Sequence, residues 1–491
     1  MSSRENHSMP RNVARAVVIK DEDIFLLAEH DGGIPQGNQD GFGLYYHDCR
    51  FLDGYEVQIA GTPPNALVAS SEKGSVAEFE LTNQQLDLGN GKSVPRQTFG
   101  LKLQRAIDPQ AHSVSDHWTV TNYAVEQHNL PLSFGFHSGF EDIFQIRGLH
   151  PKKVGKENKP RWDGDTLVLS YNGADGIERR LELQFQPKPY KTEDARATFN
   201  LSLAPGKHAE IKIGMRIVEE SATSGKNAGT GQQQEAGPLA RTRDKRSQDW
   251  LSGYAELSSD NPLLDQVMRR CLLDLLVLRG SLDGFHYFSA GLPWYGTLFG
   301  RDSIIAALET LAYEPAIAEQ TIRLLAKYQG TKNDEWRDEQ PGKILHELRR
   351  GELAHLNEIP QTPYYGSVDS TPLFLILVGE HADWTGDLKL FQELRSNVER
   401  ALHWIDNDGD EGHNGYLSYA TRSKKGLGNQ GWKDSGDSIM NADGSLATPP
   451  IALVEVQGYV YRAKLLIAAL SERSGDKATA AKLRSAADDL K

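Results

Sequence analysis

The sequence has little cysteine and no long apolar run. Cys49 and Cys271 are the only cysteines in 491 residues, which excludes a disulfide framework and a cysteine metal cluster and indicates a reducing compartment. The apolar run at 16–19 is broken by Lys20 and Asp21, well short of a secretory signal. No window approaches the roughly 18 consecutive apolar residues of a membrane span. We therefore expect a cytoplasmic protein with no membrane partner.

Positive charge is also in short supply. Lysine and arginine number 54 against 67 aspartates and glutamates, a net charge of -13 with histidine neutral. Such a surface repels phosphate backbones, so we do not expect a nucleic-acid partner. Hydrophobic residues make up 38% and charged residues 25% of the chain, which is typical of a globular protein. The length suggests roughly three domains, or two larger ones.

The chain from about Val13 to Val218 has the period of β-strands. Apolar residues occupy every second position in 211–217 and in 181–185, the alternation of a half-buried strand. Turn clusters such as 31–33 and 172–176 separate the runs. Many short strands without amphipathic helices between them predict an antiparallel β-sandwich.

The period becomes helical after a polar, Gly-rich segment, which reads as a linker. About seven helices are expected, beginning at Asn261 and near 302–311, 316–329, 371–379, 388–405, 451–473 and 477–490. Helical hairpins with long functional loops are typical of an α/α toroid. The predicted organisation is a β-sandwich domain at 1–220, a linker at 221–250 and an incomplete (α/α)6-barrel domain at 251–491.

Three loop segments concentrate the candidate chemistry, and the first is 293–303. Its aromatic residues Trp294, Tyr295 and Phe299 precede Arg301 and Asp302. Aromatic rings cover the C–H face of a sugar, and an Arg-Asp pair supplies a donor and an acceptor for its hydroxyls. The structural alternative, at about even odds, is that Asp302 caps the helix and pairs with Arg301.

The second segment is the long loop from 342 to 371. Its His346-Glu347 pair is not a zinc-protease motif, because Arg350 stands where the second histidine would be needed. Tyr364, Tyr365 and Asp369, with Glu347, are candidates for a second sugar-facing edge. The alternative is that Asp369 or Ser370 caps the next helix, and for Ser370 it is favoured.

The third segment is 429–438, which contains Trp432, Lys433, Asp434 and Asp437. A carboxylic acid beside a tryptophan ring is partly desolvated, which keeps it protonated near neutrality, as a general acid requires. Lys433 would lower the pKa of Asp434, and Asp437 would raise it. Taken alone, an Asp-Ser-Gly-Asp run is more often a solvated turn.

Two further patterns are weighed against function. The segment 406–417 imitates a calcium loop, but Glu411 and Leu417 stand where an EF-hand needs Gly and Glu. An Asx-rich turn is favoured by about three to one. Gly91-Lys92-Ser93 lacks the first glycine of a phosphate-binding loop, which Leu86 replaces. We expect no metal and no cofactor.

The motifs and their order resemble the bacterial amylo-α-1,6-glucosidases, a glycogen-debranching-like family of six-hairpin glycosidases. The resemblance is carried by Ile-Pro-Gln-Gly-Asn at 34–38, Gly-Leu-Tyr-Tyr-His-Asp-Cys-Arg-Phe-Leu at 43–52, the segments 294–303, 363–369 and 429–437, and Val-Glu-Val-Gln-Gly-Tyr at 454–459. It covers nearly the whole chain, and the joint occurrence of the motifs is specific where single motifs would not be.

The resemblance implies a β-sandwich followed by an (α/α)6 barrel whose loop end holds an α-glucan. Related enzymes hold the sugar of subsite −1 with an Arg-Asp pair, which Arg301 and Asp302 match. They place a general acid shortly after a tryptophan, where Asp434 matches best and Asp437 is the second choice.

The number of helices departs from this family. Six hairpins have twelve helices, whereas about seven are expected before Lys491. The resemblance places the general base in the last third of the barrel, so we expect it beyond residue 491. The simplest hypothesis is a truncated gene product or a fragment. If this chain is the whole protein, impaired hydrolysis and an exposed apolar flank prone to association are expected.

Three functions from different classes follow. The first is an inverting glycoside hydrolase that removes α-1,6-linked glucose from branched glucan, with Asp434 as acid. The second is a phosphorylase of similar fold, in which phosphate replaces water. The third is an α-glucan-binding protein without catalysis. The linkage rests on the resemblance alone, and no pattern predicts an oligomeric state.

Overall fold

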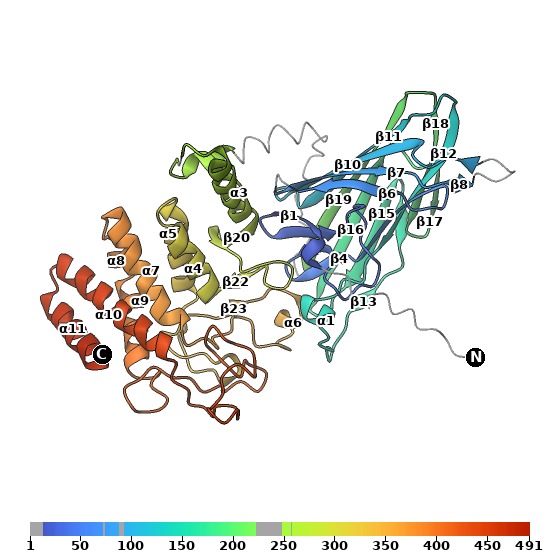
Figure 1. Cartoon of the computed structure of the whole chain (residues 1–491). Helices are drawn as coiled ribbons and strands as arrows, with labels where there is room; N and C mark the ends of the chain where they lie inside the picture. The colour runs from blue at the N-terminus through green and yellow to red at the C-terminus, as the bar shows by residue number, and fades with distance from the viewer. Residues whose placement is uncertain (1–12, 72–73, 88–92, 222–247, 257) are drawn as a thin grey trace. The chain divides into compact units, whose positions relative to one another are not determined.

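The computed structural model describes residues 13–71, 74–87, 93–221, 248–256 and 258–491. They divide into two compact units. Unit 1 comprises Met1–Gln248, Arg269–Val277 and Gly351–Leu356, and unit 2 comprises Asp249–Met268, Leu278–Arg350 and Asn357–Lys491. The expected linker at 221–250 lies mostly outside the described residues. Strands dominate unit 1, blue to green in Figure 1, and helices dominate unit 2, yellow to red.

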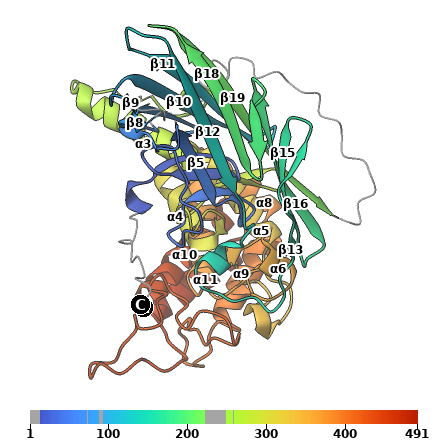
Figure 2. The ribbon, with the colours of Figure 1, turned by 90° about the vertical axis from the view of Figure 1, so that its right-hand side faces the viewer.

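Unit 1 is built from three antiparallel sheets. The largest has the order β13-β15-β16-β19-β11-β10-β7-β6, with β14 beside β15; the others have the orders β17-β18-β12-β5 and β1-β2-β3-β4. The long strands β11, β12, β18 and β19 lie together in both views (Figure 1, Figure 2). The bounds are β1 Val17–Asp21, β2 Ile24–Ala28, β3 Gly43–Tyr46, β4 Cys49–Leu52, β5 Gly54–Ile59, β6 Asn65–Ser70, β7 Val76–Thr82, β10 Phe99–Asp108, β11 Ser113–Asn122, β12 His128–His137, β13 Lys156–Glu157, β14 Arg161–Asp163, β15 Thr166–Asn172, β16 Ile177–Gln186, β17 Lys191–Glu193, β18 Arg196–Leu203 and β19 His208–Ser221. Short elements complete the unit, namely η1 Val13–Arg15, the hairpin of β8 Leu86–Asp87 and β9 Ser93–Val94, and α1 Ile143–Ile146.

Aromatic side chains join two of these sheets face to face. Trp118 of β11 packs on Phe134 of β12 with ring centroids 5.6 Å apart, and Phe185 of β16 packs on Phe199 of β18 at 6.3 Å. Strands that bury one face against another sheet alternate apolar and polar residues, as the sequence of this domain does. The predicted antiparallel β-domain is confirmed.

Unit 2 is a set of helical hairpins around α7. The helices from α3 onward are α3 Pro262–Leu278, α4 Gly300–Thr310, α5 Pro315–Lys327, α6 Glu352–His355, α7 Ser370–Thr385, α8 Lys389–Glu393, α9 Arg395–Asp406, α10 Val454–Arg473 and α11 Lys477–Leu490, with the 3-10 turn η2 Glu335–Arg337; parts of α3 and all of α6 group with unit 1. Helix α7 packs against α4, α5, α9 and α10. Its residues 370–379 are buried, as expected of a helix stretch that is apolar around its whole circumference, whereas Asp383, Trp384 and Thr385 in its last turn are exposed. The expected helical region after the β-domain is confirmed.

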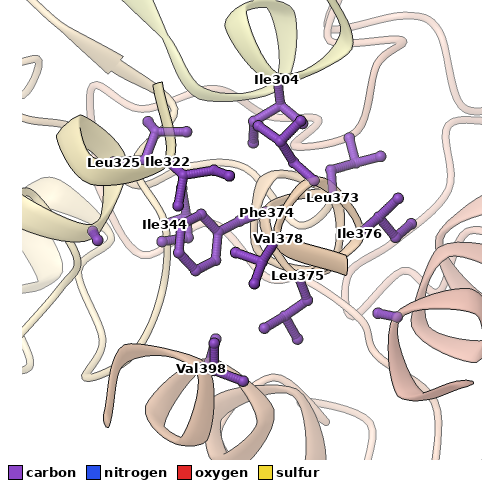
Figure 3. Close-up of a cluster of buried hydrophobic side chains, with 14 of the residues drawn as sticks. Ile304, Ile322, Leu325, Ile344, Leu373, Phe374, Leu375, Ile376, Val378 and Val398 are labelled. Carbon is purple, nitrogen blue, oxygen red and sulfur yellow. The ribbon is translucent and has the colours of Figure 1, made fainter. Parts of the chain in front are cut away.

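The core of unit 2 is centred on Phe374 of α7. Figure 3 shows its ring beside Ile344 and Val378, with Ile322 and Leu325 of α5 on the same side. All five side chains belong to one buried cluster. Close packing of this kind fixes the ends of α4 and α7, where the candidate site lies.

Two local features differ from the sequence expectation. The helix expected at 388–405 is interrupted at Leu394, which separates α8 from α9. A short hairpin of β20 Arg279–Leu282 and β21 Phe285–Phe288 precedes α4, and β22 Leu298–Phe299, directly before α4, pairs antiparallel with β23 Glu347–Leu348, which follows α5. These residues are too few for a periodic signal. Within the described part of the chain, no helix has the length and apolar character to cross a bilayer.

Candidate active site

Arg301 and Asp302 lie in the first turn of α4, at a point fixed by a close backbone approach. The Gly300 N–H donates to the carbonyl of His346 at 2.9 Å, and a Cβ on Gly300 would stand 2.1 Å from the carbonyl oxygen of Leu345. Only glycine permits this contact. It sets the start of α4 against the loop that leads to β23.

Three carboxylates surround the Arg301 guanidinium. Its Nη1 donates to Oδ2 of Asp369 at 3.1 Å, its Nη2 lies 3.6 Å from Oδ2 of Asp434, and its Nε lies 3.9 Å from Oδ2 of Asp302. The site therefore unites residues that stand far apart in the sequence. It brings together one predicted residue pair from the first segment and one carboxylate from each of the other two.

Asp369 is the buried member of this cluster. Its side chain is 1% exposed, and its Oδ1 accepts a hydrogen bond from the Ser367 hydroxyl at 2.6 Å. It stands at the N-cap position of α7, yet its side chain makes no capping hydrogen bond. Its carboxylate instead accepts a hydrogen bond from Arg301. The alternative interpretation, that Asp369 caps the helix, is therefore wrong.

Asp434 lies on a loop whose own polar groups hold it in shape. The side-chain amide of Asn429 donates to the carbonyl of Ser435 at 2.6 Å, and the Ser438 hydroxyl donates to the carbonyl of Lys433 at 2.6 Å. The side chain of Asp434 is 45% exposed, whereas that of Arg301 is 12% exposed. The cluster thus has a buried side at Asp369 and an open side at Asp434.

The charges of the cluster shift two pKa values. Burial raises the pKa of Asp302 above its usual range; Arg301 opposes this, and the negative charges of Asp369 and Asp434 reinforce it. Burial alone would lower the pKa of Arg301, but these same carboxylates raise it. A carboxyl pushed toward its neutral form can donate as well as accept a hydrogen bond, which suits a sugar hydroxyl.

The three predicted aromatic residues differ in exposure. Tyr295 is 45% exposed, and Phe299 is buried at 5%. Their rings meet edge to face at 5.8 Å, and the Arg349 guanidinium lies 5.6 Å from the centre of the Phe299 ring. Trp294 is partly buried, and its carbonyl accepts from Arg349 at 2.8 Å. Tyr295 presents an open ring, and Phe299 supports the loop from within.

The expected second sugar-facing edge is wrong for its tyrosines and Glu347, which lie in the interior. Tyr364 is 0% exposed and donates its hydroxyl to Asp338 at 2.8 Å. Tyr365 is buried and donates to the carbonyl of Tyr328 at 2.8 Å. Glu347 is buried and accepts from Nε of Arg349 at 2.8 Å. Their polar atoms are used inside the protein, where an unpaired group would be costly.

The expected shielding of Asp434 by Trp432 is also wrong. Trp432 is 56% exposed, and the Lys433 ammonium lies 5.2 Å from the centre of its ring. Lys433 and Asp437 are exposed. Asp434 forms an ion pair with Arg301. The interaction that holds Asp434 is therefore its ion pair with Arg301, and the indole ring of Trp432 is exposed to solvent.

The described residues include no group of three His, Cys, Asp or Glu side chains that could hold a metal ion. Asp410 of the calcium-like segment accepts backbone N–H groups of Asn414 at 3.1 Å and Gly415 at 2.8 Å, which is the Asx-rich turn that the sequence favours. Gly91-Lys92 lies outside the described residues. A cavity of about 530 Å³ lies in unit 1 beside β5 and β12, away from the predicted site residues.

Residues 19–214 match the family described as the N-terminal domain of (some) glycogen debranching enzymes. The match covers most of the β-rich domain. No curated protein matches the sequence. Among solved structures, the chain is similar to a putative kojibiose phosphorylase from human microbiome, with 10% identity and a TM-score of 0.63 over 98% of this chain and 68% of that one. It is also similar to a bacterial glucoamylase complexed with acarbose, with 10% identity and a TM-score of 0.55 over 100% of this chain and 68% of that one. At this identity the likeness shows a shared fold.

Tyr459 is a neighbour of the cluster that is absent from the predicted site residues. It lies on α10, partly buried. Burial raises its pKa, and the charges of Asp369 and Glu455 add to this while Arg301 opposes it. Glu455 precedes it by four residues and so shares its face of the helix. That spacing within the motif 454–459 is the sequence signal that identifies this face.

Proposed function

We propose that the protein is an inverting glycoside hydrolase that acts on α-glucans and releases α-1,6-linked glucose from branched chains in the cytoplasm. The observation that carries this proposal is the pairing of Arg301 with Asp369, Asp302 and Asp434 at the start of α4. The debranching-enzyme domain at 19–214 and the fold shared with a glucoamylase support the substrate class. The α-1,6 linkage is proposed because the matched domain occurs in glycogen debranching enzymes.

The cluster can bind a glucosyl unit through complementary roles. Arg301 donates to sugar hydroxyls while Asp369 fixes its orientation, because a guanidinium presents its donors in a rigid plane. Asp302 accepts or donates at a neighbouring hydroxyl. The open ring of Tyr295 can cover an apolar sugar face, since aromatic rings pack well on C–H groups.

Asp434 is the proton donor in this proposal. A sugar held against Arg301 removes water from the half-exposed Asp434 side chain, and loss of water favours the neutral form of a carboxyl group. The proton passes to the glycosidic oxygen as its bond to the anomeric carbon breaks. Water adds to that carbon from the opposite face and gives its proton to a second carboxylate, so an α-linkage yields β-glucose.

Glucose release from a limit dextrin tests the proposal, with NMR detection of the first anomer formed. We expect release of β-glucose by the wild type. In Asp434→Asn, release is lost while co-sedimentation with glycogen is retained. Asp443→Asn, an exposed carboxylate in a nearby turn, is the matched control and keeps its activity. Release of α-glucose, or full activity in Asp434→Asn, contradicts the proposal.

The shared fold with a putative kojibiose phosphorylase favours a second candidate, a glycoside phosphorylase. In that reaction phosphate replaces water at the anomeric carbon. The same assay with added inorganic phosphate separates the two, since a phosphorylase forms glucose 1-phosphate and depends on phosphate for turnover. Binding to glycogen without either product indicates an α-glucan-binding protein instead.

A further inference from the structure

Asp338 is a buried carboxylate in unit 2 that the proposed reaction does not use. It is 3% exposed and follows η2 with a left-handed backbone at φ 50°. The turn that contains it is closed by hydrogen bonds between Asp334 and Glu339, at 3.1 Å and 3.0 Å. Hydrogen bonds within its own turn therefore hold the backbone of Asp338 in place.

Four donors converge on this carboxylate. Oδ1 accepts the backbone N–H groups of Arg422 at 2.7 Å and Ser423 at 3.0 Å. Oδ2 accepts the hydroxyl of Tyr364 at 2.8 Å and the side-chain amide of Gln430 at 3.3 Å. Two carboxylate oxygens have about four acceptor positions, so these bonds saturate the group.

Tyr364 extends the same contact along the chain. Its hydroxyl accepts the backbone N–H of Leu427 at 2.8 Å, and a Cβ on Gly426 would lie 2.3 Å from that hydroxyl. The residues 422–430, which we call the clamped segment, therefore wrap around the Asp338–Tyr364 pair. Glycine at 426 is required by this close approach.

The clamped segment ends directly before the loop of Asp434. The carbonyl of Gln430 accepts the backbone N–H of Val368 at 2.8 Å, and Val368 precedes Asp369. Asp434 follows Gln430 by four residues. Gln430 thus connects the buried Asp338 carboxylate to Asp369 and Asp434, two of the three acidic partners of Arg301.

The ionic surroundings of Asp338 also favour a positional role. Lys343 is buried, and its ammonium donates to the Asp338 carbonyl at 3.4 Å. Burial lowers the pKa of Lys343 to about 8, and the charge of Asp338 opposes this. Buried charges add less to stability than well-packed apolar groups, whereas their directional bonds specify one arrangement.

We propose that Asp338 is a positioning residue that places the Asp434 carboxylate against Arg301 by holding the clamped segment. The kinetic consequence rests on the proposed function, but the structural consequence does not. Misplacement of a reacting group by about 1 Å can reduce turnover by about a hundredfold.

Graded variants test this role. Asp338→Ala removes all four acceptor bonds, Asp338→Asn keeps an oxygen for the two backbone donors, and Tyr364→Phe keeps the carboxylate but removes the bridging hydroxyl. Asp443→Ala is the control, since its exposed carboxylate accepts from Ser445 within its own turn. Amide hydrogen exchange at 422–430 is measured in each, with α7 as the internal reference.

A spin label at residue 434 reports the position of the loop without any activity. It is introduced as Asp434→Cys with Cys271→Ser, because Cys49 is buried and Cys271 is exposed. We expect Asp338→Ala to speed exchange at 422–430 by about tenfold or more and to mobilise the label, with α7 unchanged. Asp338→Asn falls between Asp338→Ala and the wild type, and Asp443→Ala matches the wild type.

Kinetics then separate positioning from stability. In variants that fold, we expect kcat for glucose release to fall by about 10- to 100-fold while KM changes by less than about twofold. Unchanged exchange at 422–430 or an unchanged label in Asp338→Ala overturns the proposal, as does full kcat with a loosened segment. If Asp338→Ala does not fold, Tyr364→Phe is judged by the same readouts. If the wild type releases no glucose, the proposed function is contradicted. Hydrogen exchange at 422–430 and the mobility of the spin label at residue 434 still test whether Asp338 holds the clamped segment.

Discussion

Lowering the pH from 7 to 5 should destabilise unit 2 through the buried imidazole of His346. This side chain is 3% exposed and stands edge-on to the rings of Phe299 and Tyr364, with centroids 5.5 Å and 6.0 Å away. Its Nδ1 has no hydrogen-bond partner among the described residues. Burial, together with the positive charges of Arg301, Arg349 and Lys343, lowers its pKa from 6.5 to about 3.

The sign and size of the effect follow from linkage. Between pH 6.5 and pH 3 the unfolded chain binds a proton at this residue and the folded chain does not, so stability is lost as the pH falls. With pKa values of 6.5 unfolded and about 3 folded, the loss between pH 7 and pH 5 amounts to about 2 kcal/mol. Above about pH 7 the imidazole is neutral in both the folded and the unfolded chain, so this loss of stability is absent.

Two measurements check this prediction. The imidazole signal assigned by loss in His346→Phe should not titrate in NMR spectra above about pH 4. Denaturant unfolding of His346→Phe should show a change in stability from pH 7 to pH 5 that is smaller than the wild-type change by about 2 kcal/mol. The exposed His403→Gln is the control. An imidazole that titrates near pH 6.5, or equal pH dependence in both proteins, refutes the reasoning.

Three further predictions concern packing and charge. Gly300→Ala places a Cβ 2.1 Å from a backbone carbonyl and should lower the unfolding free energy by at least about 2 kcal/mol. The control is Gly458→Ala on α10, where the added Cβ meets open space. It should be neutral or stabilising in the same denaturant titration. The Arg105 guanidinium is 0% exposed and lies 2.7 Å from the Asp116 carboxylate. Asp116→Ala removes this partner and should lower the unfolding free energy by about 3–5 kcal/mol. A loss below about 1 kcal/mol would contradict this. Arg301→Lys cannot serve three carboxylates with a planar fork, so kcat/KM for glucose release should fall at least about tenfold without a change in melting temperature above a few degrees.

The β-domain could be predicted because its sequence period is local. Alternation in 211–217 predicts a half-buried strand, and Ile211, Ile213 and Met215 are each 0% exposed in β19. Helix α4 is predicted by the same kind of signal, with Ile304 buried on its inner face. Side-chain period fixes which face of an element is buried, and that information is present in any ten residues.

The site could be predicted only in part because burial at a loop depends on distant residues. Arg301 and Asp369 are each predicted as site residues from separate segments, and the structure pairs them. Tyr364 is of a residue type that can contact a sugar. In the structure its hydroxyl instead donates to the buried carboxylate of Asp338. No local pattern distinguishes these roles, since the donors to Asp338 come from residues 364, 422, 423 and 430.

The proton-donor role of Asp434 is tested most directly by two substrates that differ in their need for a proton. Fluoride leaves without protonation, so α-glucosyl fluoride bypasses a general acid, whereas a glucan does not. We expect Asp434→Asn to lose about 10²- to 10⁴-fold in kcat/KM on branched glucan and to hydrolyse α-glucosyl fluoride within about tenfold of the wild type. Equal losses on both substrates, or an unimpaired reaction on the glucan, would contradict the assignment of Asp434 as the acid.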